Sequence, residues 1–356
     1  MRKSIRCVLI VGVITGALAG ATPALAAFAP KIIVKPASTG GTNLRVAVGT
    51  GDDPTARFVL YAPIGATATF PIAPGTPLGA VSAHAAAADL GGAVLPLTGN
   101  VLVANPADPV ILAASTSCDP VTHLAILVLN LQAAGQTLNV PLFIDQASGA
   151  ETAFSAIKIT VCLPPPDVPV GTPGRAMFGA KLLDADFTIS SLLGPTAAGQ
   201  HRWRSLWTPY IPLVGKINAA ATVETQSIIF QPTSLTIKAT TVGKVKKVKK
   251  KRVVTTTATV SGSLQAGGAG APDQKVTIVA GGKTVGTVTT KSDGTFTFSM
   301  KITKATVFQA KVESPDRDLG ASACTATFAA QAISCIQATV AGGSLASNTV
   351  RAVPRR

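Results

Sequence analysis

The chain has 356 residues and a net charge of +15, with 47% hydrophobic and only 13% charged residues. Its length is sufficient for two ordinary domains with cores of their own. Such an apolar composition would also be compatible with a membrane protein. However, no segment after residue 26 has the roughly 18 consecutive apolar residues of a spanning helix.

The first 26 residues predict export. Three basic residues precede an apolar run over residues 8–19, and Ala24-Leu25-Ala26 has the small residues that signal peptidase requires. An apolar run of about a dozen residues is too short to span a bilayer. We therefore expect a signal peptide over residues 1–26 and a secreted, extracellular protein. The alternative is an uncleaved N-terminal anchor.

Cysteine usage agrees with export. Four cysteines follow the signal, and an even number in an exported chain favours disulfides. They are Cys118, Cys162, Cys324 and Cys335. Only the pairing Cys118–Cys162 with Cys324–Cys335 keeps each bridge within one half of the chain, so we predict that pairing. A zinc site made of four cysteines is the alternative, but the chain lacks the closely spaced pairs that it needs.

Residues 27–242 are predicted to form one large β-sandwich domain. Apolar residues alternate with polar or small ones in short runs bounded by Gly and Pro, a pattern typical of strands. The fold class is therefore expected to be all-β. The clearest runs are residues 31–36, 44–49, 57–63, 94–104, 123–131, 137–145, 157–163, 181–189, 201–207 and 219–230.

Both tryptophans of the chain lie in the segment 201–210. On a strand, His201, Trp203 and Trp207 would share one face. Turned outward, the two indoles would form a ledge for a carbohydrate or peptide ligand. Turned inward, they would be the largest anchors of the core, which is the usual fate of such residues and the interpretation we favour. Packing between domains is a third possibility.

The composition changes abruptly over residues 243–252, which contain seven basic residues and no acid. Such a block repels itself and cannot be buried, so it indicates a domain boundary or an exposed ribbon, and we place a basic linker there. The second interpretation is retention at an anionic cell-wall polymer or membrane surface, which salt would weaken. Nucleic acid is not an expected target, because no recognition module is present. The basic residues are Lys244, Lys246, Lys247, Lys249, Lys250, Lys251 and Arg252.

Residues 253–345 show strand alternation most clearly and are predicted to form a second β-sandwich, of the immunoglobulin type. Phe296, Phe298 and Ile302 would point to one side of a strand that follows the tight turn Asp293-Gly294. Six or seven strands in about 85 residues fit such a domain. A basic tail over residues 346–356 completes the expected organisation.

The segment 261–300 resembles the bacterial immunoglobulin-like and carboxypeptidase-regulatory-like modules of secreted multidomain proteins. The shared features are the Gly-x-Leu strand at Gly262, the Val-x-Ile strand at Val276, and the Thr-x-x-Asp-Gly-x-Phe hairpin from Thr290 to Phe296. This resemblance implies a spacer or adhesion-type sandwich without an active site. The N-terminal part resembles uncharacterised secreted proteins of high-GC Gram-positive bacteria, which adds no function.

No motif predicts a catalytic, cofactor or metal site. Ser155 and Lys158 form an S-x-x-K sequence, but on a strand they would lie on opposite faces, and neither H-E-x-x-H nor G-x-S-x-G occurs. We therefore expect a non-enzymatic structural or adhesive protein of the cell envelope or extracellular space. The runner-up is a module that binds a carbohydrate or a protein partner near Trp203 and Trp207, and a secreted enzyme comes third.

Overall fold

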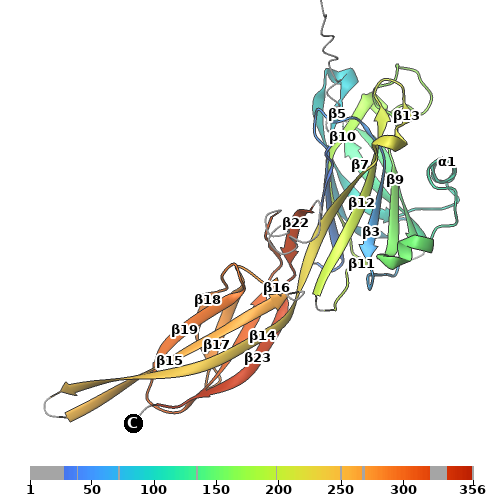
Figure 1. The fold of residues 1–356 in the computed structure, drawn as a ribbon. Coiled ribbons are helices and arrows are strands. Elements are labelled where there is room, and N and C mark those ends of the chain that lie inside the picture. Colours follow the sequence, from blue (N-terminus) through green and yellow to red (C-terminus); the bar gives the residue numbers. More distant parts are fainter. Residues whose placement is uncertain are drawn as a thin grey trace, which may run out of the picture.

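The computed structural model describes residues 28–354, apart from 38, 71–72, 134, 198, 249–250, 267–268 and 321–334. The molecule is elongated and has two lobes, each made of β-strands (Figure 1). This confirms the all-β, sandwich-type fold class. The predicted signal peptide and Cys324 lie outside the described residues, so the Cys324–Cys335 bridge stays a prediction.

The first lobe is one strongly curved antiparallel sheet. Its end strand β1 returns to lie beside β14, where the Val34 N–H donates to Ser227 Oγ at 3.0 Å. The strands in pairing order are β1 (Lys31–Pro36), β2 (Thr42–Ala47), β10 (Ala180–Ile189), β5 (Pro77–Ala87), β6 (Ala93–Val103), β7 (Ala125–Ala133), β8 (Gln136–Gln146), β9 (Ser155–Cys162), β3 (Thr55–Pro63), β12 (Gly199–Ile211) and the first part of β14 (Val223–Val248).

The concave face of this sheet holds the core of the first lobe. Each strand contributes every second residue, as in β2, where Leu44 and Val46 are buried and Arg45 is exposed. Aliphatic side chains fill most of the space, and both tryptophans lie among them. The short elements around the sheet are β4 (Thr67–Ala68), β11 (Leu192–Leu193), β13 (Lys216–Ile217), η1 (Ala88–Leu90), η2 (Gly149–Ala153), η3 (Met177–Gly179) and η4 (Ala219–Ala221).

One α-helix, α1 (Pro109–Cys118), packs on the outside of the first lobe and was not predicted. Its first turn is stabilised by Asp108, whose Oδ1 accepts a hydrogen bond from the Val110 N–H at 2.8 Å. Pro109 occupies the first helical position, where its missing N–H costs nothing. The Asp-Pro pair was therefore a helix-start signal. It was hidden because only Ile111 of the helix is buried, which leaves no apolar periodicity to detect.

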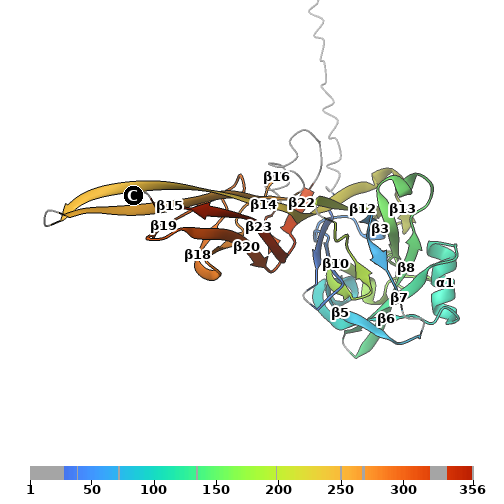
Figure 2. The same cartoon turned by 90° about the horizontal axis from the view of Figure 1, so that it is seen from below.

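The second lobe is a sandwich of two sheets around a separate core (Figure 2). Phe296 and Ile302 are buried as predicted, and Phe298 packs against the same cluster. One sheet contains the second part of β14, β15 (Lys251–Ala266), β16 (Ala269–Gly270) and β19 (Thr295–Ile302). The other contains β18 (Lys283–Thr289), β17 (Lys275–Ala280), β20 (Thr306–Ser314) and β23 (Gly343–Ala352), while β21 (Arg317–Asp318) and β22 (Cys335–Val340) extend the sheet at the junction of the lobes.

The two lobes are joined by β14 itself. Residues 223–231 of this strand pair with β12 in the first lobe, and residues 232–248 pair with β15 in the second. A register shift between Pro232 and Ser234 marks the crossing, as expected where a proline interrupts a ladder. The change from one core to the other therefore falls near residue 230, before the basic segment 243–252, whose described residues belong to a hairpin.

The predicted basic tail from residue 346 is also part of the fold. Strand β23 extends to Ala352 and pairs with β20 along its length. Ser347 and Ala352 are buried, and the Asn348 side chain bonds to both the N–H and the C=O of Ile237 at 2.9 and 3.1 Å. The basic residues at the chain end obscured this strand, because its fully buried positions are occupied by the small residues Ser347 and Ala352.

Candidate functional sites

The alternative interpretation of the segment 201–210 as an exposed aromatic ledge is wrong. Trp203 and Trp207 are both completely buried in the core of the first lobe. The Trp207 ring stacks on Phe58 with centroids 4.7 Å apart, and its Nε1–H donates to Ser205 Oγ at 2.7 Å. With no indole surface exposed, neither residue can stack on a ligand, so the interpretation of this face as core is the right one. His201 is half-buried, with Nε2 at 2.6 Å from the Ala197 carbonyl oxygen.

The opposite face of β12 is polar and internally paired. Arg204 donates two hydrogen bonds to the Glu224 carboxylate, each of 2.7 Å, and these bonds hold the pKa of Glu224 below its usual value. The same guanidinium lies 4.0 Å from the centre of the Phe154 ring. Since the charges on this face already have partners, it shows no ready site for an ionic ligand.

If the tryptophans are core residues, a charged quencher cannot reach them. We expect iodide to leave most of the native Trp emission unquenched, and to quench it strongly only after unfolding in denaturant. The substitution Trp207→Ala should lower the free energy of unfolding by about 3–5 kcal/mol, because it leaves a cavity beside Phe58. Trp207→Phe, which keeps a stacked ring, is the matched control and should cost clearly less. Native emission as quenchable as that of the unfolded chain would contradict the burial.

The basic segment forms the end of a long hairpin instead of a linker. The backbone of residues 244–248 pairs with residues 251–255, and β19 begins to pair with β15 only at Thr256. Figure 1 shows that this end of β14 and β15 projects beyond the rest of the second lobe. We call residues 243–256 the basic hairpin. Apart from Thr256, its two outer edges have no strand partner among the described residues.

Toward the tip of the basic hairpin, several of the described side chains are exposed to solvent. Lys244 is exposed, as are Val245 and Val253 on the two strands. No acidic residue occurs in the sequence between Glu224 and Asp273, so the block has no neighbouring counterion on its own strands. Lysines also protect unpaired edges from aggregation, which is the simplest role for the block. The backbone of the block lies at the end of the hairpin that projects beyond the rest of the second lobe.

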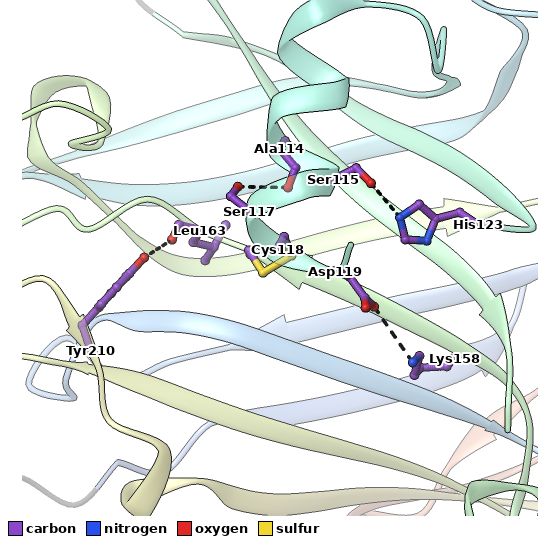
Figure 3. The surroundings of a disulfide bond; sticks show 10 residues. Ala114, Ser115, Ser117, Cys118, Asp119, His123, Lys158, Leu163 and Tyr210 are labelled. Atoms are coloured by element: carbon purple, nitrogen blue, oxygen red, sulfur yellow. Dashed lines mark hydrogen bonds and ion pairs between the residues drawn. A yellow bond between two sulfur atoms is a disulfide. The ribbon is translucent and has the colours of Figure 1, made fainter. Parts of the chain in front are cut away.

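A disulfide fastens helix α1 to the sheet (Figure 3). Cys118, the last residue of α1, is bonded to Cys162, the last residue of β9, as predicted. Beside it, Asp119 Oδ2 lies 3.9 Å from Lys158 Nζ. The helix has few buried residues of its own, so these covalent and polar connections supply much of what holds it in place.

A Ser–His–Asp arrangement lies next to the disulfide and was not predicted. Ser115 Oγ is 3.0 Å from His123 Nε2, and His123 Nδ1 is 2.9 Å from Asp145 Oδ1. The His123 and Asp145 side chains are 3% and 9% exposed. They come from α1, the loop after it and β8, so no local motif could reveal them. An open hollow of about 510 Å³ beside His123 is lined by residues that include Asp145 and Lys158.

The geometry resembles that of a serine nucleophile, but the surroundings of Ser115 differ from those of one. Acyl transfer needs backbone N–H groups or other donors directed at the developing oxyanion. Ser115 lies in the second half of α1, where N–H groups point back into the helix, and its own carbonyl accepts from the Asp119 N–H. Ser115 is also absent from the lining of the adjacent hollow. The arrangement is best suited to holding α1 against β8.

No protein-family model matches the chain, and no match to it was found among curated proteins. Within the described part of the chain, no helix is long and apolar enough to cross a bilayer. The same residues contain no group of three or more His, Cys, Asp or Glu side chains that could hold a metal ion.

The disulfide should contribute substantially to stability. It closes a loop with a sequence separation of 44 residues, so loop-closure entropy predicts a loss of about 4 kcal/mol in the double variant Cys118→Ser/Cys162→Ser. Urea unfolding would measure this loss. Any further loss when the same variant is treated with a reductant belongs to Cys324 and Cys335. A double variant as stable as the parent would show that the bridge constrains nothing.

Proposed function

We propose that this protein is an exported, non-enzymatic structural or adhesive component of the cell envelope or extracellular space, and that its basic hairpin binds an anionic wall polymer. The observation that carries the proposal is the position of the basic residues at the projecting end of a two-stranded ribbon (Figure 1). A simple linker between two domains would not need basic residues at the end of a projecting ribbon.

The chemistry of the basic hairpin favours a polyanion with regularly spaced charges. Seven basic residues within ten positions can neutralise several phosphates, and each contact releases a counterion. Backbone pairing keeps the strands extended, so neighbouring charges on one face are spaced by roughly 7 Å. Binding of this kind is sensitive to salt and tolerant of ligand sequence, as suits a repetitive wall polymer.

The rest of the chain fits a role outside the cell. The N-terminal pattern of basic, apolar and small residues directs export. The Cys118–Cys162 bridge is typical of proteins that fold in an oxidising compartment. Because β14 runs through both lobes without a flexible connection, the molecule is suited to act as a spacer that carries the hairpin away from the first lobe.

Neutralising the basic hairpin should abolish polymer binding. For the variant Lys246→Gln/Lys247→Gln/Lys249→Gln/Lys250→Gln we expect at least a tenfold weaker affinity for poly(glycerol phosphate) at about 0.1 M salt. The slope of log K against log salt should fall by roughly 3, since about 0.7–0.9 counterions are released per contact. Titration calorimetry over a salt series measures both.

The matched control removes four exposed lysines of the second lobe outside the hairpin, Lys283, Lys291, Lys301 and Lys304. It has the same net charge as the hairpin variant and should retain most of the affinity. Equal losses in both variants would mean that only net charge matters, which would contradict a localised site.

A second test concerns the absence of catalysis. We expect no hydrolysis of activated esters and no labelling of Ser115 by a fluorophosphonate probe. Ser115→Ala should instead lower stability by about 1 kcal/mol, the net value of one hydrogen bond. Labelling that disappears in Ser115→Ala would identify a serine hydrolase and overturn the non-enzymatic assignment.

A further inference from the structure

The outer edge of β14 in the basic hairpin has a defined backbone direction. Farther back on this strand, the Ile237 N–H donates to Asn348 Oδ1 at 2.9 Å and the Ile237 C=O accepts from Asn348 Nδ2 at 3.1 Å. Both groups of Ile237 therefore point away from β15. Successive residues of a strand alternate in this respect, and the pairing with β15 has no register shift over residues 234–248. The backbone groups that also point away from β15 are those of Gly243, Val245 and Lys247.

No strand covers these backbone groups within the described part of the chain. In the second lobe β14 pairs with β15 alone, and the hairpin projects beyond the rest of that lobe (Figure 1). Unpaired N–H and C=O groups along a strand edge form a template for one more strand. Three outward residues correspond to a strand of about six residues, which is a common length in globular proteins.

The edge lacks two of the features that usually keep strand edges from pairing. Natural edges are protected by prolines, by bulges or by charged residues. No proline occurs between Pro232 and Pro272, and the ladder is regular up to Val248. The hairpin also exposes apolar side chains, since Val245 is 53% exposed and Val253 is 45% exposed. Its basic residues are thus the protection that this edge has.

The charge of the hairpin decides which kind of strand the edge can accept. No acidic residue occurs within residues 225–272, and none occurs within 294–312 or 343–356, which contain the strand ends that adjoin the base of the hairpin. A second copy would place two basic blocks side by side, and like charges on neighbouring strands destabilise their pairing. Acidic side chains would form cross-strand ion pairs instead. The basic residues therefore exclude the hairpin of another copy and favour an acidic partner.

A phosphate polymer would use only part of this surface. It would neutralise the basic residues, but it has no backbone N–H and C=O groups to pair with a strand edge and no branched apolar side chain to contact Val245. An extended acidic polypeptide has all of these groups. When a peptide adds to a sheet edge, main-chain hydrogen bonds supply the affinity and alternate side chains supply the specificity.

We propose that the edge of β14 at Gly243, Val245 and Lys247 binds an extended acidic segment of a partner protein as an additional β-strand. Carboxylates of this segment lie beside the basic residues of the hairpin, and its β-branched side chains lie beside Val245. The segment gives the projecting ribbon a third strand, and a ribbon of two strands is only marginally stable by itself. Strand addition depends on the backbone edge as well as on charge, whereas the polymer of the proposed function depends on charge alone.

The test uses the mature chain and a synthetic peptide of about ten residues in which Glu and Val alternate. Titration calorimetry at about 0.1 M salt measures its affinity. Amide hydrogen exchange followed by NMR locates the contact. We expect the peptide to slow exchange at Gly243, Val245 and Lys247 at least tenfold, because their N–H groups gain carbonyl partners. No binding, or binding that leaves this exchange unchanged, would overturn the inference.

The substitution Val245→Pro removes one outward N–H without removing a bond to β15. It should weaken peptide binding at least tenfold and leave the affinity for poly(glycerol phosphate) within about twofold, because no charge changes. The matched control Val245→Ala keeps the N–H and should retain most of the peptide affinity. Equal peptide binding by Val245→Pro and the parent would contradict strand addition.

A modified peptide tests the same bonds without altering the hairpin. With every amide nitrogen methylated, the peptide keeps its charge but donates no backbone hydrogen bond, so the parent chain should bind it at least tenfold more weakly. Equal binding of both peptides would overturn the inference. Slowed exchange at the three amides in concentrated protein without peptide would overturn it in favour of a second copy. A parent chain that binds the peptide but not poly(glycerol phosphate) supports strand addition and contradicts the proposed polymer binding alone.

Discussion

The whole architecture depends on one strand that serves two cores. In β14, successive side chains point to opposite faces, so Ile229 belongs to the core of the first lobe while Ile228 and Phe230 belong to that of the second. A strand of 26 residues spans roughly 85 Å. Because the ladder is continuous from β12 to β15, the lobes share hydrogen-bonded backbone where most tandem domains have a flexible linker.

The residues of the two cores differ from those of the surface. The large aromatic residues, such as Trp203, Trp207 and Phe296, are used inside the two cores. On the surface, basic residues cluster in the sequence of the hairpin of β14 and β15, whereas exposed apolar residues occur on both lobes and on the hairpin itself. The helix α1 adds almost no core and depends on the disulfide and on the Ser115–His123 bond.

Local sequence patterns were sufficient to predict much of the fold, but they predicted little of the candidate functional sites. The alternation in β2 and β19 predicted which side chains are buried, because a strand's faces are set by a period of two residues. Strand β5 escaped notice, since its inward residues are mostly alanines that differ little from their neighbours in hydropathy. The Ser115–His123–Asp145 arrangement combines side chains from a helix, a loop and a strand, so no local motif contains them.

The amino-acid sequence by itself determined the β-rich class, the Cys118–Cys162 pairing among three possibilities, and the inward direction of Trp203 and Trp207 as the favoured interpretation. These follow from local periodicity and from composition. Only the tertiary structure decided that residues 243–252 end a hairpin and that Ser115, His123 and Asp145 come together. The physical reason is that strand pairing and loop contacts join segments that are far apart in the chain. Several segments have similar local preferences, so a local pattern does not specify which of them pair.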